Sequence, residues 1–252
     1  MRHKYAALAA ILVAGCAAPV PKAVELTRPV PAVTPAKVQV SFTRFVMSTD
    51  QVEGDAGVAG RQVTIDDPVR VASISKLIVA LAVMRLVDDG KVNLDRDVGE
   101  YLGWPIRNPA FPATPITLRQ LMSHRAGLRD EIDYILPLDG DLAQILSDPR
   151  AWDRLHGPGT FFQYANINSP LIAATIEGAT GERFDRLMSR LVLEPLGLDA
   201  CFNWATGCSS NRRAQAVTLL RPNGVLAKDP RLLDNQECGV QPAGDGSCDI
   251  EK

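Results

Sequence analysis

The apolar positions along the chain predict a β-hairpin followed by a mostly helical body. Apolar residues alternate over 37–47, which predicts a strand, and a β-branched run at 63–65 predicts a second strand that pairs with it. Over 75–89 apolar side chains are almost continuous, a pattern typical of a helix that is buried on most faces. Gly90 follows this segment and predicts the C-terminal end of the helix.

Capping residues and helical periodicity predict three more helices farther along the chain. Thr117 and Gln120 have the spacing of a capping box, so a helix is expected to begin after Thr117. A third helix is predicted over 169–179, with Ser169 as its N-cap and a proline in its first turn. A fourth is predicted over 182–194, where the apolar residues fall on one helical face. This order of elements predicts an α+β domain.

Composition and charge exclude several classes of protein. The chain has 252 residues, of which 46% are hydrophobic and 22% charged, as in ordinary globular domains and unlike coiled coils, collagen or disordered chains. Lys and Arg number 27 against 29 Asp and Glu, which leaves no basic surplus to bind nucleic acid. The three histidines, His3, His124 and His156, lack the spacing of metal ligands. We therefore expect no nucleic-acid partner, no metal site and no cofactor.

The first 16 residues have the pattern of an export signal with a lipid anchor. An apolar run at 6–14 is shorter than the roughly 20 residues that span a bilayer, but it is typical of a signal peptide. The run ends in Val-Ala-Gly-Cys, which resembles the lipobox of bacterial lipoproteins. We therefore expect a signal peptide over 1–15 and acylation of Cys16. The alternative is an ordinary cleaved signal in which Cys16 is incidental.

Residues 16–36 are predicted to tether a folded domain, 37–252, to the membrane. Five prolines in this segment favour an extended, semi-rigid chain. Ala17 rather than an aspartate follows Cys16, as in lipoproteins that are sent to the outer membrane, so we expect the domain to face the periplasm. The alternative is a disordered leader without an anchoring role.

Four of the five cysteines follow the predicted tether: Cys201, Cys208, Cys238 and Cys248. An even number of cysteines in an exported protein predicts disulfides, and four cysteines allow three pairings. We expect Cys201 to pair with Cys208 and Cys238 with Cys248, because short loops close most readily. The alternative is that some of the four remain free thiols.

Ser73 and Lys76 form a Ser-x-x-Lys motif at the start of the longest predicted helix. Residues three apart share a helical face, so Lys76 could take the proton of the Ser73 hydroxyl. The N-terminus of a helix also favours developing negative charge, through its free backbone N–H groups and its dipole. The motif is common by chance, and the alternative interpretation is a capping serine beside a lysine that reaches solvent.

Tyr164 and Asn166 form a second motif, directly before the third predicted helix. A tyrosine can act as a base or pass protons when a nearby lysine lowers its pKa. The Asn166 amide can hydrogen-bond both a substrate carbonyl and Lys76. Taken alone, this motif has the alternative interpretation of a buried tyrosine and an asparagine near a helix start.

Together the two motifs resemble those of the penicillin-recognising serine hydrolases, in the branch of class C β-lactamases, D-alanyl-D-alanine peptidases and related esterases. Ser73-x-x-Lys76 is followed about ninety residues later by Tyr164-Ala165-Asn166. Further segments are similar to family patterns in the same order, namely 86–95, 116–128, 157–164 and 193–198. The similarity extends from about residue 69 to residue 198.

The resemblance implies a β-lactamase/transpeptidase-like α+β fold, in which a helical body packs on an antiparallel sheet. It implies acyl transfer on a β-lactam, a D-Ala-D-Ala peptide or a small ester. Ser73 would attack the carbonyl, and Lys76 and Tyr164 would carry its proton to the leaving group. Asn166 would hold the substrate, and the backbone N–H of Ser73 would supply half of an oxyanion hole.

The family has a third motif, Lys-Thr-Gly or His-x-Gly on a C-terminal strand, which does not occur after Asn166. In the family, that strand supplies the second oxyanion donor and binds the substrate carboxylate, and relatives are usually longer. We therefore expect the C-terminal strands of the sheet to be missing from the domain. The alternative function is a non-catalytic periplasmic lipoprotein that binds peptidoglycan or acts as a scaffold.

Overall fold

The computed structural model describes residues 37–43, 46–54, 56, 61–132, 134, 141–204 and 207–218. All of them belong to one compact unit, Val33–Lys252. The predicted signal peptide, Cys16 and the tether lie outside the described residues, as do Cys238 and Cys248. Among the described residues, no helix has the length and apolar character needed to cross a membrane.

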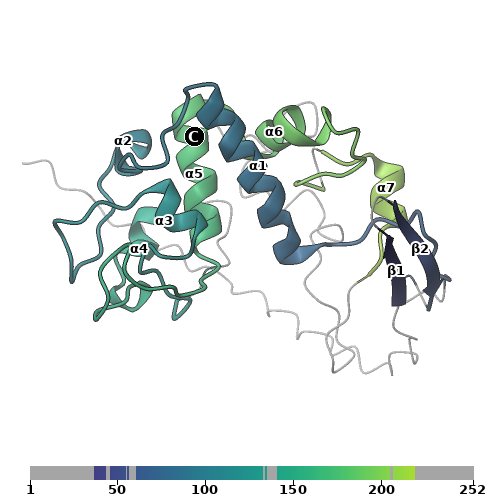
Figure 1. The fold of residues 1–252 in the computed structure, drawn as a ribbon, viewed down its shortest axis with the longest axis horizontal. Helices are drawn as coiled ribbons and strands as arrows, with labels where there is room; N and C mark the ends of the chain where they lie inside the picture. Colours follow the sequence, from purple (N-terminus) through teal and green to yellow (C-terminus); the bar gives the residue numbers. More distant parts are fainter. Residues whose placement is uncertain are drawn as a thin grey trace, which may run out of the picture. The chain divides into compact units, whose positions relative to one another are not determined.

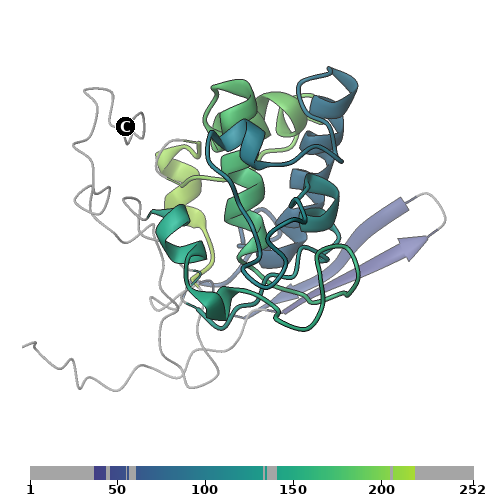
Figure 2. The same ribbon diagram turned by 90° about the vertical axis from the view of Figure 1, so that its left-hand side faces the viewer.

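The N-terminal hairpin differs from the sequence prediction. Strands β1 (Lys37–Thr43) and β2 (Val46–Glu53) pair antiparallel, with Thr43 opposite Val46 (Figure 2). The single strand predicted over 37–47 is therefore two strands, and the partner predicted at 63–65 is wrong. In the sequence, the alternation of apolar residues at 38, 40 and 42 breaks after Phe42, because the residues at 45–47 are all apolar, and this break marks the turn that we missed. At 63–65 the Thr64 N–H donates to the Asp67 carboxylate at 2.8 Å, which fixes a turn instead of a strand.

Helix α1 (Ser75–Asp88) confirms the longest predicted helix, and a 3₁₀ turn, η1 (Ala72–Ile74), leads into it. Its last turn closes when the N–H of Asp89 donates to the carbonyl of Arg85. Gly90 follows with a φ of +67°, a left-handed conformation that glycine adopts without strain.

The two faces of α1 have different surroundings. On one face Ala82, Val83 and Leu86 are at most 2% exposed and lie in the core. The opposite face carries apolar side chains that are 41–68% exposed, namely Ile74, Leu77, Leu81 and Met84. The prediction that α1 is buried on most faces is therefore wrong. Among the described residues, the elements that contact α1 pack against one side of it.

The predicted capping box is confirmed at the start of helix α3 (Leu118–Met122). The Thr117 hydroxyl accepts from the Gln120 backbone N–H at 3.3 Å, and the Gln120 side chain accepts from the Thr117 N–H at 3.1 Å. These two bonds satisfy backbone donors that the first helical turn leaves without partners.

The third predicted helix is α5 (Asn168–Thr180), but Ser169 is not its N-cap. The cap residue is Ile167, and no side chain of the cap residue bonds the first turn. The Asp130 carboxylate accepts the backbone N–H of Ile167 at 3.1 Å instead, and so anchors the approach to the helix from a distant loop. Gly181 ends α5 with a φ of +68°.

The fourth predicted helix is α6 (Phe184–Met188), which continues as a π-helical turn, η3 (Ser189–Leu193). Sequence reasoning missed the short elements α2 (Gly99–Leu102), α4 (Leu142–Leu146), η2 (Pro149–Ala151) and α7 (Ser210–Gln215).

Helix α5 contacts α2 and α3, whereas α1 contacts α6 and η3 (Figure 1). The α2–α5 approach requires glycine at 178, because a Cβ atom there would lie 2.4 Å from the Tyr101 carbonyl oxygen.

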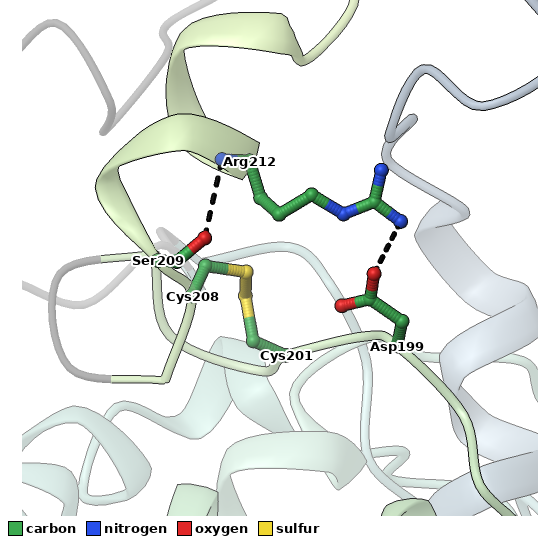
Figure 3. The surroundings of a disulfide bond; sticks show 5 residues. All are labelled: Asp199, Cys201, Cys208, Ser209 and Arg212. Atoms are coloured by element: carbon green, nitrogen blue, oxygen red, sulfur yellow. Dashed lines mark hydrogen bonds and ion pairs between the residues drawn. A yellow bond between two sulfur atoms is a disulfide. The ribbon is translucent and has the colours of Figure 1, made fainter.

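A disulfide joins Cys201 to Cys208, as the sequence predicted (Figure 3). The Ser209 hydroxyl then caps α7 by accepting the Arg212 backbone N–H at 3.3 Å. The Arg212 guanidinium pairs with the Asp199 carboxylate at 2.5 Å, on the other side of the disulfide loop. The loop that follows η3 is therefore closed by one covalent bond and one ion pair.

Candidate active site

The structure brings together the four residues of the two sequence motifs. The Ser73 Oγ lies 2.9 Å from the Tyr164 hydroxyl and 3.1 Å from the Lys76 Nζ. The Asn166 Oδ1 lies 3.3 Å from the Lys76 Nζ and 3.3 Å from the Tyr164 hydroxyl. One hydroxyl, one ammonium, one phenol and one amide thus form a closed ring of hydrogen bonds.

Local backbone geometry places Ser73 at the entrance of α1. Ser73 lies in η1, and the helix begins two residues later, so Lys76 stands one turn along on the same side. Ala72, directly before the serine, has a φ of +46°, which costs about 1–3 kcal/mol for a residue with a Cβ atom. The Ser75 hydroxyl donates to the Ala72 carbonyl at 2.6 Å and holds this strained turn in place.

The donors and acceptors give the ring a direction. Lys76 can only donate, so its ammonium donates to the Ser73 Oγ and to the Asn166 Oδ1. With Lys76 donating into its oxygen, Ser73 is free to donate its own proton to the Tyr164 oxygen. The Tyr164 hydroxyl in turn donates to the Asn166 Oδ1 at 3.3 Å, so Tyr164 can take the serine proton once it has lost its own.

The surroundings of Tyr164 lower the pKa of its hydroxyl. The hydrogen bond from Ser73 is the largest cause, and the Lys76 ammonium adds a hydrogen bond and a favourable charge. The Lys76 Nζ also lies 5.3 Å from the centre of the Tyr164 ring. These contacts stabilise the phenolate, which is the form that can accept a proton.

Asp130 holds Asn166 and was missed by sequence reasoning. Its carboxylate accepts the Asn166 backbone N–H at 2.8 Å and the Asn166 side-chain N–H at 2.9 Å, besides the N–H of Ile167. Because the Nδ2 of Asn166 is engaged by the carboxylate, its Oδ1 must face Lys76 and Tyr164. The one sequence signal for Asp130 was its position two residues after the segment at 116–128, which resembles a family pattern.

His124 supports Tyr164 through ring stacking. Its ring stacks on the Tyr164 ring at 4.4 Å between centroids and 29° between planes. Its Nδ1 accepts from the Ala165 N–H at 3.3 Å and the Asn168 Nδ2 at 3.2 Å, so that nitrogen carries no proton. Burial first, and then the positive charge of Lys76, lowers the pKa of His124, which keeps the ring neutral.

A cavity of about 530 Å³ adjoins the four-residue ring. Lys76 and Asn166 belong to both, whereas Ser73 and Tyr164 do not line the cavity. Its walls are mostly apolar side chains, namely Val79, Ala80, Leu121, Met122, Pro170, Ile172, Ala173, Phe184 and Phe202. The volume falls within the roughly 300–1,000 Å³ of small-molecule sites. Within the described part of the chain, no group of three His, Cys, Asp or Glu side chains could hold a metal ion.

Solved structures share this fold. A class C beta-lactamase matches 78% of this chain and 52% of its own, with a TM-score of 0.62 and 17% identity. The D-alanine carboxypeptidase AmpC from Burkholderia cenocepacia covers the same shares, with a TM-score of 0.60 and 20% identity. The structure of SurE has a TM-score of 0.56 at 28% identity, over 78% of this chain and 43% of that one. The chain therefore has a β-lactamase/transpeptidase-like fold.

Curated relatives agree with the structural neighbours. Esterase EstB of Burkholderia gladioli is 32% identical over 162 residues, which are 57% of this chain and 40% of EstB. The D-alanyl-D-alanine-carboxypeptidase/endopeptidase AmpH of Escherichia coli K12 is 28% identical over 142 residues, 53% of this chain and 36% of AmpH. The matched part of this chain thus spans less than half the length of either relative. The family model for beta-lactamase matches residues 42–247, and the chain belongs to the beta-lactamase family.

Proposed function

We propose that this protein is a serine hydrolase that works through an acyl-enzyme on Ser73. The observation that carries the proposal is the position of the Ser73 Oγ, within hydrogen-bond distance of both the Lys76 Nζ and the Tyr164 hydroxyl. A serine hydroxyl needs such a base to become a nucleophile. The substrate carries an amide, β-lactam or ester carbonyl, in keeping with the names of the relatives EstB and AmpH.

In the first half of the reaction, Ser73 forms a bond to the substrate carbonyl carbon. The Tyr164 phenolate takes the serine proton as the new C–O bond forms, and the ammonium of Lys76 offsets the negative charge. Tyr164 then gives that proton to the leaving alcohol or amine as the old bond breaks. Proton transfer by a positioned side chain contributes about 10²–10⁴ in rate.

In the second half, water removes the acyl group. Tyr164, again a phenolate, takes a proton from the attacking water, which forms a bond to the acyl carbon. The bond to Ser73 breaks and Tyr164 returns the proton to the Ser73 oxygen, so the enzyme is restored. The Asn166 Nδ2 has a second hydrogen, which would donate to a carbonyl of the substrate, while Asp130 accepts the other and fixes the orientation of Asn166.

We further propose that the exposed face of α1 packs on an antiparallel sheet that lacks the C-terminal strands of the family. The Ser73 backbone N–H would supply one oxyanion donor, and the second donor, which those strands carry in the family, would come from another group. The support is the apolar stripe at Leu77, Leu81 and Met84, whose spacing is that of a helix face made for burial.

We also propose that the protein is an exported lipoprotein. The support is the sequence pattern alone: a signal peptide at 1–15, an acylated Cys16 and a proline-rich tether at 16–36. The domain would then face the periplasm, anchored to the outer membrane.

The test is hydrolysis of three substrates: nitrocefin, p-nitrophenyl acetate and a peptide ending in D-Ala-D-Ala. Wild type, Ser73→Ala and Ser123→Ala are compared, because the Ser123 hydroxyl bonds the Arg119 carbonyl and lies outside the ring. We expect turnover of at least one substrate by wild type and Ser123→Ala, and none by Ser73→Ala. Equal turnover by Ser73→Ala would refute the proposal, and a folded but inert wild type would favour the non-catalytic lipoprotein.

A further inference from the structure

We propose that the apolar cavity beside Lys76 holds the hydrocarbon acyl chain of an ester substrate. The inference rests on the proposed function and narrows it, because it selects carboxylic esters with apolar acyl groups among the three candidate substrate classes. The cavity shares Lys76 and Asn166 with the ring of hydrogen bonds, so it adjoins Lys76, whose Nζ lies 3.1 Å from the Ser73 Oγ.

Helices α1 and α5 both line the cavity, called the chamber below, and in both helices the lining residues change from polar to apolar with distance from the N-terminus. Helices α1 and α5 both begin at the site, and their first residues, Ser75, Lys76, Asn168 and Ser169, line the polar part. One turn farther along, α1 contributes Val79 and Ala80, and α5 contributes Ile172 and Ala173. A molecule with a polar carbonyl at one end and a hydrocarbon chain at the other matches this gradient.

Charge within the chamber argues against a carboxylate or a charged peptide. Lys76 is the only Lys, Arg, Asp or Glu side chain among the described residues that line it. That ammonium already donates to Ser73 and Asn166. The lowered pKa of His124 keeps the other basic side chain in the lining neutral. A carboxylate placed deeper, among the apolar side chains beyond Lys76, would meet no charged cation in the described lining, and burying an unpaired charge is costly.

Two aromatic rings close part of the wall. Phe184 and Phe202 meet edge to face, with 5.3 Å between ring centroids and 90° between planes. Phe202 directly follows Cys201, whose disulfide to Cys208 closes the loop that carries it (Figure 3). The wall is therefore built from α6 and a covalently closed loop, and it limits the length of chain that fits.

The first experiment measures kcat/KM for p-nitrophenyl acetate, butyrate, hexanoate and octanoate with the wild-type chain. Burial of each methylene group in an apolar site is worth up to about fourfold in kcat/KM. We expect kcat/KM to rise with chain length by at least tenfold over the series. A flat or falling series would overturn the proposal.

The second experiment changes the chamber itself. Ala173→Phe narrows it and should lower the octanoate-to-acetate ratio of kcat/KM by at least tenfold, whereas Phe202→Ala lengthens it and should move the optimum to a longer chain. Ala174→Phe is the matched control, because Ala174 neighbours Ala173 on α5 but does not line the cavity. Equal ratios in Ala173→Phe and Ala174→Phe, with both proteins folded by circular dichroism, would overturn the proposal. If Ala173→Phe does not fold, an unchanged optimum in Phe202→Ala decides against it.

The outcome also separates this inference from the proposed function. Acylation of Ser73 with no preference for chain length would remove the acyl-chain role and leave the serine hydrolase intact. Preferred turnover of nitrocefin or of the D-Ala-D-Ala peptide over every ester would do the same. No acylation of a folded chain by any of these substrates would overturn both.

Discussion

The two faces of helix α1 are held in opposite ways. On the body side, Lys76 bonds Ser73 and Asn166, and Val83 is fully buried. On the other side, Leu77 and Leu81 are 62% and 43% exposed among the described residues. One helix therefore has a buried face beside the ring of hydrogen bonds and an apolar face without a described partner.

The difference teaches where the catalytic groups get their positions. Tyr164 and Asn166 are fixed by His124 and Asp130, which lie on the body side. Ser73 and Tyr164 are thus held within hydrogen-bond distance by contacts of the helical body alone. In the proposed mechanism, a second oxyanion donor would affect the rate more than this alignment.

The largest predicted effect comes from placing a charge on each face of α1 in turn, which tests whether the two faces differ in burial. Val83→Asp buries an unpaired carboxylate in the core and should lower the free energy of unfolding by about 4 kcal/mol or more. Leu81→Asp should also destabilise the protein, by more than about 1 kcal/mol, because a sheet is proposed to cover that face. Urea unfolding of both variants measures this. A change below about 0.5 kcal/mol for Leu81→Asp would mean that the face is open to solvent.

The next effect concerns the proton acceptor. Tyr164→Phe should lower kcat by about 10²–10⁴, since the phenyl ring cannot accept the serine proton. In wild type, kcat/KM should rise with pH as the phenolate forms, and the lowered pKa of Tyr164 places that rise below the ordinary value of about 10. The measurement is a pH–rate profile of both proteins. A rise that persists unchanged in Tyr164→Phe would assign the base to another group.

The smallest predicted effect concerns the residue that positions Asn166. Asp130→Asn replaces a carboxylate that accepts three N–H bonds, and should lower kcat about tenfold or more. Because the Asp130 charge raises the pKa of Tyr164, the rise of the pH–rate profile should also move to lower pH in this variant. The matched control is Glu131→Gln, whose exposed carboxylate pairs with Arg129 away from the ring. Equal kcat for Asp130→Asn and Glu131→Gln would show that Asn166 does not need this support.

The sequence was enough to find the four residues that meet in the ring of hydrogen bonds. Ser73 and Lys76 are one helical turn apart, and Tyr164 and Asn166 are two residues apart, so each pair is a local pattern. The order of the motifs identified the family, and with it the expectation that the pairs meet in space. Their contact spans 91 residues between Ser73 and Tyr164, which no local rule could supply.

The supporting residues could not be predicted because they act through tertiary contacts. Asp130 bonds a backbone N–H 36 residues away, and His124 bonds one 41 residues away. For the same reason the cap of α5 was assigned to Ser169, a local candidate, although the cap residue is Ile167 and a distant carboxylate accepts its backbone N–H. Burial of α1 was overestimated because its apolar pattern reports which faces suit burial and not which ones are covered.

The most direct test of the account is the mass of the protein after a short incubation with benzylpenicillin or p-nitrophenyl butyrate, quenched in acid. We predict one acyl adduct per wild-type chain with at least one of the two reagents, on the peptide that contains Ser73. The Ser73→Ala variant should carry none, and Ser123→Ala should match wild type. An adduct of equal yield on Ser73→Ala, or no adduct on a folded wild-type chain with either reagent, would contradict the assignment of Ser73 as the nucleophile.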